Sequence, residues 1–209
     1  MFDSSLQFRL QPFVSAICVY LDRAGLTANQ MTIIGFGFGI AAGGFIAAEF
    51  YSVGLVLFLL NRCCDGLDGG LARLQGPTDR GGYLDIVADF LIYSWIPFGF
   101  ALSNPNFALA AAFLIFSFIG TGSSFLAYAI IEAKRQGSTD IAGKSKKSTR
   151  TQKSFFYLGG LTEGAETILA LSLACLFPGF FSVIAVVFGV MCWLTTFSRI
   201  YAGWTDFQD

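Results

Sequence analysis

Residues 65–89 decide how this chain is interpreted. The segment begins Asp65-Gly66-Leu67-Asp68-Gly69-Gly70-Leu71-Ala72-Arg73, and after a seven-residue spacer it continues Gly81-Gly82-Tyr83-Leu84-Asp85-Ile86-Val87-Ala88-Asp89. Two pairs of carboxylates therefore lie in a stretch that otherwise resembles membrane-spanning sequence. Each ionised carboxylate costs roughly 2.5 to 3.5 kcal/mol near the centre of a bilayer. Four such groups together require a compensating cation.

The composition of the whole chain is that of a membrane protein. Of its 209 residues, 55% are hydrophobic and only 13% are charged, whereas soluble domains carry about 25% charged residues. The sequence contains no histidine, which excludes Ser-His-Asp catalysis and histidine-based zinc sites. The five cysteines show no C-x-x-C spacing, so we expect no disulfide framework.

Six apolar segments are long enough to cross a membrane, and turn residues separate several of them. They are residues 31–50, 52–74, 82–102, 106–131, 160–177 and 180–203. Residues 2–22 carry apolar side chains at helical spacing, which predicts an amphipathic helix on the membrane surface, kinked or restarted at Pro12. The alternative is a frayed terminus. We therefore predict an all-α integral membrane protein with one domain over 1–209 and a six-helix bundle over 31–203.

The distribution of basic residues predicts the orientation in the membrane. Seven of the thirteen Lys and Arg residues lie between positions 134 and 153, and the turns near 50, 104 and 178 contain none. The positive-inside rule then places both termini and the aspartates at the cytoplasmic face of an inner (plasma) membrane.

Glycines in the first predicted span are interpreted as packing residues. Gly35, Gly37, Gly39 and Gly43 lie in a helical context without the strand and turn of a dinucleotide-binding motif. Small residues at such spacing allow helices in lipid to approach closely. The hydroxyls of Thr121, Ser123 and Ser124 are expected to bond back to their own helix.

Helical geometry brings the four aspartates together. At about 100° per residue, Asp65 and Asp68 share one face with Arg62. Asp85 and Asp89, at i and i+4, share a face of the next helix. The Gly76-Pro77 turn makes the two helices antiparallel. Four hard oxygen donors suit Mg²⁺ or Mn²⁺, and two such ions would form a clamp for displacement at phosphorus. Helix packing with internal Arg–Asp pairs is the alternative.

The full pattern resembles the signature of the CDP-alcohol phosphotransferase family. The eight matching positions are Asp65, Asp68, Gly69, Ala72, Arg73, Gly81, Asp85 and Asp89. The stretch Ala28-Asn29-Gln30-Met31-Thr32 is similar to the family's Pro-Asn-x-x-Thr entry to the first span, with Ala28 in place of the proline.

This resemblance implies transfer of a phosphatidyl-type group from a CDP-linked lipid, such as CDP-diacylglycerol, to an alcohol, with release of CMP. It implies that the four aspartates hold the metals and that Asp89 also acts as the general base. It further implies a homodimer and a nucleotide site with no nucleic-acid partner. That site would be lined by Gly69, Ala72, Arg73, Gly81, Asn29 and Thr32.

The sequence leaves the acceptor alcohol open. Glu163 and Glu166 would favour a cationic acceptor, although acids also suit the positive end of a helix. The basic loop, through Lys144, Lys147 and Arg150, would favour a phosphorylated alcohol, or it sets topology and attracts anionic lipid. Arg199 would bind an acceptor phosphate or extend its charge to the membrane surface.

Three rival functions are weighed against this one. An Asp-rich membrane prenyltransferase would need about nine spans and two separated motifs, and it would release pyrophosphate. A cation-binding or ion-conducting protein would distribute its acids across the bilayer. A non-catalytic subunit would not need the complete signature.

Overall fold

The computed structural model describes residues 2–141, 162 and 164–207, and the side chains from residue 13 to 135, at 162, and from 164 to 207. Within these residues all regular structure is helical. The α-helices are α1 (Phe2–Arg23), α2 (Ala28–Ala47), α3 (Tyr51–Gln75), α4 (Asp79–Ser103), α5 (Ala108–Ile141), α7 (Gly164–Leu176) and α8 (Phe181–Asp206). Short 3₁₀ turns at Pro105–Phe107 and Pro178–Phe180 precede α5 and α8.

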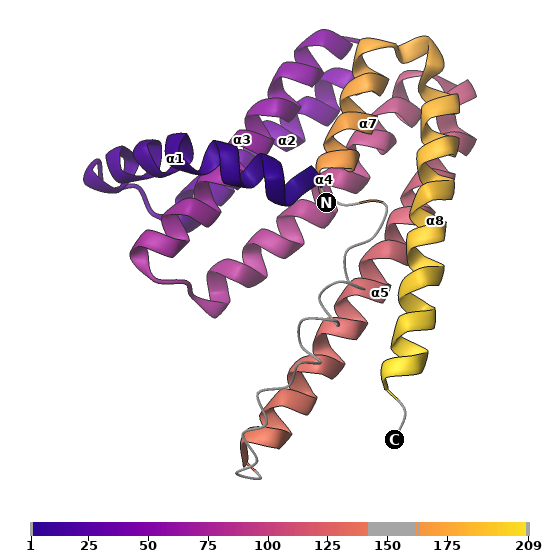
Figure 1. Ribbon diagram of the computed structural model, residues 1–209. Helices are drawn as coiled ribbons and strands as arrows, with labels where there is room; N and C mark the ends of the chain where they lie inside the picture. The colour runs from indigo at the N-terminus through magenta and orange to yellow at the C-terminus, as the bar shows by residue number, and fades with distance from the viewer. Residues whose placement is uncertain (1, 142–161, 163, 208–209) are drawn as a thin grey trace.

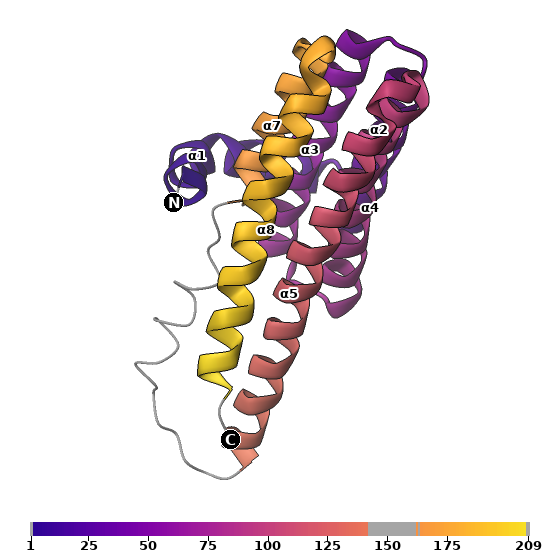
Figure 2. The same ribbon diagram turned by 90° about the vertical axis from the view of Figure 1, so that its right-hand side faces the viewer.

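The helices form a bundle with two distinct parts (Figures 1 and 2). Helices α2, α3 and α4 pack closely on one another, and α5 and α8 run side by side. The two parts are joined where α4 packs on α5 and where α7 contacts both α3 and α8. Helix α1 lies crosswise to the long helices and packs against α3.

The predicted membrane class is confirmed by four helices that are long and apolar enough to span a bilayer. Their bounds are Ala28–Ala47, Asp79–Ser103, Pro105–Arg135 and Pro178–Asp206. Helix α7 is apolar but has only 13 residues, and α3 carries the charges of Arg62, Asp65, Asp68 and Arg73. Helix α5 continues to Ile141, past the predicted end at residue 131, because its polar last turns extend the helix beyond the apolar segment.

Local sequence determines where two of the site helices begin. The Thr27 hydroxyl accepts from the backbone N–H of Gln30 while the Gln30 side chain accepts from Thr27 N, which forms a capping box at the start of α2. At the start of α4, the Thr78 hydroxyl accepts from the N–H of Gly81. These caps fix the two helix ends that border the site described below.

Close packing of α2 on α3 depends on a glycine, as the sequence predicted. A Cβ atom at Gly35 would lie 2.8 Å from the Cβ of Cys64, so a larger residue would force α2 away from α3. Far from this contact, aromatic side chains build the core. Phe100 of α4 stacks on Phe181 of α8 with ring centroids 4.2 Å apart.

Candidate active site

Three aspartates from two helices converge at one point. Asp65 and Asp68 lie on α3 and Asp85 lies on α4, and one carboxylate oxygen from each lies within 4.8 Å of the others. The two helices face each other because the Gly76-Pro77 turn reverses the chain between them. The predicted convergence of the two acidic helix faces is therefore present in the structure.

Asp89, the fourth aspartate of the predicted set, has a different environment. Its Oδ1 accepts a hydrogen bond from a terminal nitrogen of Arg62 at 2.9 Å. Arg62 is also 3.7 Å from an oxygen of Asp65. The sequence analysis assigned all four aspartates to the metals and made Asp89 the general base as well, and the structure shows a group of three with Asp89 in an ion pair with Arg62. Arg62 precedes the family signature, and the sequence analysis gave it no function.

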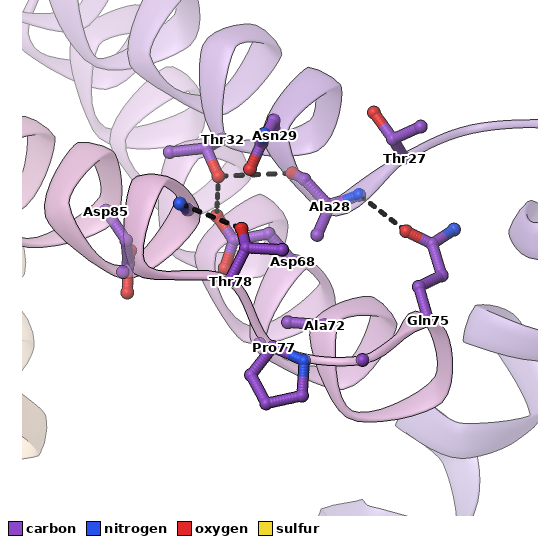
Figure 3. Close-up of a pocket in the computed structure, with 14 residues that line it drawn as sticks. Thr27, Ala28, Asn29, Thr32, Asp68, Ala72, Gln75, Pro77, Thr78 and Asp85 are labelled. Carbon is purple, nitrogen blue, oxygen red and sulfur yellow. Dashed lines mark hydrogen bonds between the residues drawn. The ribbon is translucent and has the colours of Figure 1, made fainter.

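Asp68 is the most enclosed of the three grouped aspartates. Its side chain is buried, and one of its oxygens accepts from the Thr32 hydroxyl at 2.6 Å. Since Thr32 comes from α2, this contact ties a third helix to the acid cluster (Figure 3). Thr32 was predicted to contact a nucleotide, and the structure places it where it also orients a carboxylate.

A cavity of about 330 Å³ opens beside the acid cluster. This volume lies within the range of small-molecule sites, roughly 300 to 1,000 Å³. Its lining includes Asp68, Asp85 and five of the six residues predicted for the nucleotide site, namely Asn29, Thr32, Gly69, Ala72 and Gly81. The sixth, Arg73, is exposed on α3 and is not among the lining residues.

Glycine keeps part of this cavity open. A Cβ atom at Gly81 would lie 2.9 Å from the side-chain oxygen of Asn29 and 3.1 Å from the hydroxyl of Thr78. Any other residue at position 81 would therefore displace one of these two groups. The contact explains physically why the family signature fixes a glycine at this point.

Sequence reasoning missed Gln75, which holds the rim of the cavity together. Its side-chain oxygen accepts from the N–H of Ala28, and its amide nitrogen donates to Asp22 and to the carbonyl of Leu26. One amide thus joins the end of α3 to α1 and to the start of α2. A glutamine in the last turn of a helix looks like a solvated residue, so no pattern in the sequence marks it. The cavity is also lined by Thr27, Pro77, Thr78 and Gly82, none of which the sequence analysis assigned to a site.

Of the acceptor candidates, the two that the structure describes, Glu166 and Arg199, are not among the residues that line this cavity. Lys144, Lys147, Arg150 and Glu163 fall outside the residues whose placement is described. Glu166 is half-buried in α7. Arg199 of α8 donates to the carbonyl of Thr121 at 3.1 Å and lies over the ring of Phe125, so its charge is directed at α5.

The donor set fits a divalent cation of the Mg²⁺ and Mn²⁺ type. Three carboxylates close together and near a polar cavity provide hard oxygen ligands, which these ions prefer over sulfur or nitrogen. Without such ions, three carboxylates whose oxygens lie within 4.8 Å of one another would repel strongly if all were ionised. A cation beside a cavity is the arrangement required to bind a diphosphate.

Helical membrane architecture, an acid cluster and an adjoining cavity together define a membrane transferase that acts on phosphate esters. The chain belongs to the CDP-alcohol phosphatidyltransferase family, whose sequence model matches residues 25–197. It is therefore a transferase of phospholipid biosynthesis.

Two proteins of similar sequence support the family assignment. The chain is 49% identical over 210 residues to the inner membrane protein YnjF of Escherichia coli, covering 100% of this chain and 98% of that one. It is 29% identical to the archaetidylinositol phosphate synthase of Pyrococcus horikoshii over 87% of this chain and 85% of the synthase.

A solved structure shares the fold. The phosphatidylinositol phosphate synthase of Mycobacterium tuberculosis, crystallised with CDP-DAG bound, matches with a TM-score of 0.64 at 22% identity. The match covers 92% of this chain and 94% of the synthase. The same enzyme has been crystallised with manganese and citrate, and that structure matches with a TM-score of 0.63.

Proposed function

We propose that this protein transfers a phosphatidyl group from a CDP-linked lipid, CDP-diacylglycerol in the first instance, to an alcohol and releases CMP. The observation that carries the proposal is the position of Asp65, Asp68 and Asp85 beside a cavity lined by Asn29 and Gly81. A diphosphate placed between them would have its charge next to the cation ligands and its nucleotide in the cavity.

Each group in the site then has a defined part in the reaction. Asp65, Asp68 and Asp85, with Asp89 as a further ligand, would hold two Mg²⁺ or Mn²⁺ ions, whose positive charge would offset that of the diphosphate and of CMP. Asp89 lies one turn beyond Asp85 and accepts the proton of the acceptor hydroxyl. The hydroxyl oxygen forms a bond to the lipid-linked phosphorus while the bond from this phosphorus to the bridging diphosphate oxygen breaks. Thr32 keeps Asp68 in place, and Arg73 extends toward the diphosphate from the rim.

We also propose how the chain sits in the membrane. Helices α3 and α7 complete a six-span bundle, because their neighbours on both sides are apolar spans and α3 buries Arg62 and Asp68 inside the protein. Helix α1 lies on the membrane surface with Phe13, Ile17 and Tyr20 exposed toward lipid. The acid cluster and both termini face the cytoplasm, the membrane is the inner membrane, and two copies associate.

Phosphorylated alcohols are the first acceptors to test. Two similar proteins are named as synthases of archaetidylinositol phosphate and of phosphatidylinositol phosphate. The basic residues 134–153 would suit an acceptor that carries a phosphate.

The test uses the full-length protein in lipid nanodiscs with CDP-diacylglycerol, Mn²⁺ and a panel of free and phosphorylated alcohols. We expect CMP release to depend on Mn²⁺ and on one acceptor, and a new lipid of matching mass to appear. Asp68→Asn serves as the inactive control. Absence of CMP with every acceptor, or transport of cations across the bilayer instead, would contradict the proposal.

A further inference from the structure

We propose that Gln75 is a positioning residue for the nucleotide, because it fixes the first turn of α2 as a proline at position 28 would. The inference rests on the proposed function, since it gives the rim contact a role in placing Asn29 and Thr32 against the CDP group. Ala28 stands where the family's entry motif has proline. The start of α2 therefore lacks a rigid residue in this chain and carries an additional N–H group.

The side-chain amide of Gln75 has a single orientation. Its nitrogen donates to Oδ1 of Asp22 at 2.9 Å and to the carbonyl of Leu26 at 2.8 Å, which uses both of its hydrogens. Its oxygen accepts from the N–H of Ala28 at 3.1 Å (Figure 3). A rotated amide would point its donors at an N–H group and its oxygen at two acceptors. Asp22 and Leu26 thus orient the group that binds the start of α2.

Helix α1, which supplies Asp22, is itself fixed on α3. Cys18 is fully buried, and its Sγ atom lies 3.5 Å from the carbonyl of Leu67. A Cβ atom at Gly70 would lie 2.5 Å from this sulfur, so the glycine lets the two helices approach closely. The contact keeps Asp22 at a fixed distance from the end of α3.

The N–H of Ala28 is a group that α2 cannot satisfy by itself. Ala28 is the first residue of α2, and the first four N–H groups of a helix have no carbonyl within the helix to bind. Proline is favoured at this position because it has no N–H and a φ already suited to a helix. Thr27 has the extended backbone that precedes a proline, with φ −97° and ψ 156°. Gln75 solves the same problem with an acceptor from α3.

The residues that would contact the nucleotide lie within the next turn of α2. The side-chain oxygen of Asn29 lies where a Cβ atom at Gly81 would approach to 2.9 Å. The hydroxyl of Thr32 lies 3.1 Å from the carbonyl of Ala28 and donates to Asp68 at 2.6 Å. A shift of the first turn would therefore change the contact with α4 and the contact with the acid cluster together.

A simple stabilising contact between α1 and α3 is the competing explanation, and a proline background separates the two. The test titrates the full-length protein in nanodiscs with CDP and Mn²⁺ by calorimetry. We expect Gln75→Leu to weaken CDP binding about tenfold or more in the wild-type background. In the Ala28→Pro background, where the N–H is absent and φ is fixed, the same change should cost less than about threefold.

Turnover provides a second measurement of the same contact. The KM for the CDP-lipid should rise with the CDP dissociation constant in Gln75→Leu, while kcat stays within about threefold. Equal losses of CDP binding in the two backgrounds would overturn the proposal, because the contact would then act without Ala28. Asn106→Leu is the control, since it removes an exposed amide beyond the opposite end of α4 and should match the wild type.

Hydrogen exchange decides the matter if Gln75→Leu does not fold. In the wild-type protein we expect the amide of Ala28, followed by NMR, to exchange about tenfold or more slowly than an unprotected amide. Exchange at the unprotected rate would overturn the proposal.

Failure of the proposed function gives a different result. If the wild-type protein binds no CDP and releases no CMP, the transferase proposal fails. The exchange rates of residues 28–32 in Gln75→Leu and in the wild type still report whether Gln75 fixes the first turn of α2, and equal rates would show that it does not.

Discussion

The two parts of the bundle differ in what their buried hydroxyl and charged side chains bind. In α2, α3 and α4, polar groups bond between helices, as Thr32 does to Asp68 and Arg62 does to Asp89. In α5 and α8, the serine and threonine hydroxyls donate to carbonyls of their own helix, and the bonds between these two helices come from Tyr128, Arg135 and Arg199. Ser117 donates to Phe113, Thr121 to Ser117 and Phe118, and Thr196 to Cys192.

This difference shows where geometry matters to the chemistry. A hydroxyl in lipid needs a partner, and a carbonyl of its own helix satisfies it without fixing any neighbour. A bond between helices holds the two helices in register. The α2–α4 part therefore keeps carboxylates at fixed separations, while the serine and threonine hydroxyls of the α5–α8 part fix no neighbouring helix.

Neutralising the base should have the largest effect on turnover. For Asp89→Asn we expect kcat to fall by about 10² to 10⁴, the usual contribution of a general base. Binding of the CDP-lipid, measured by titration, should be retained because Asp89 does not line the cavity. Unchanged turnover would remove Asp89 from its assigned role.

Loss of the rim contacts should have the next largest effect. Gln75→Leu removes three hydrogen bonds that join α3 to α1 and α2. We expect the KM for the CDP-lipid to rise about 10- to 100-fold, at roughly 1 kcal/mol per bond, with a smaller change in kcat. A change in kcat alone would show that the rim does not shape the nucleotide site.

The sequence predicted the helices and the acid cluster because both follow from local rules. Apolar length and the turns at residues 76–77, 103–105 and 178–179 located the helices to within a few residues, except at the end of α5, which continues to Ile141. The i, i+3 and i, i+4 spacing of the aspartates placed them on single faces, which one turn then brought together. Back-bonding of Thr121, Ser123 and Ser124 was likewise predicted and is confirmed.

Contacts between distant segments could not be predicted in the same way. The bond from Arg62 to Asp89 depends on the rotation of α3 relative to α4, which no periodicity specifies. Gln75 and Thr78 enter the site through helix ends, and Arg73 lies outside the cavity lining although it belongs to the signature. Spacing shows which residues share a face, and packing decides which of them share a cavity.

A matched pair of threonines tests the contrast between the two parts directly. Thr32→Val removes the bond to Asp68, and Thr121→Val removes only bonds within α5. We expect Thr32→Val to weaken Mn²⁺ binding and kcat/KM about tenfold, as outer-shell partners of metal ligands do. Thr121→Val should match the wild type within about twofold. Equal effects of the two variants would show that the bond between helices at Thr32 matters no more to the site than the bonds within α5 at Thr121.

The smallest effect on turnover is expected from a large change in the aromatic core. Phe181 is fully buried between Phe100 and Phe107, and Phe100 lies roughly 22 Å along α4 from Asp85. Phe181→Ala should leave a cavity that lowers the free energy of unfolding by about 3 kcal/mol, measured as a drop in melting temperature. Below that temperature kcat should stay within about twofold of the wild type, because the cross-helix bonds around the aspartates are intact. A large loss of kcat in the folded variant would mean that packing at the far end of α4 also sets the spacing of the acids.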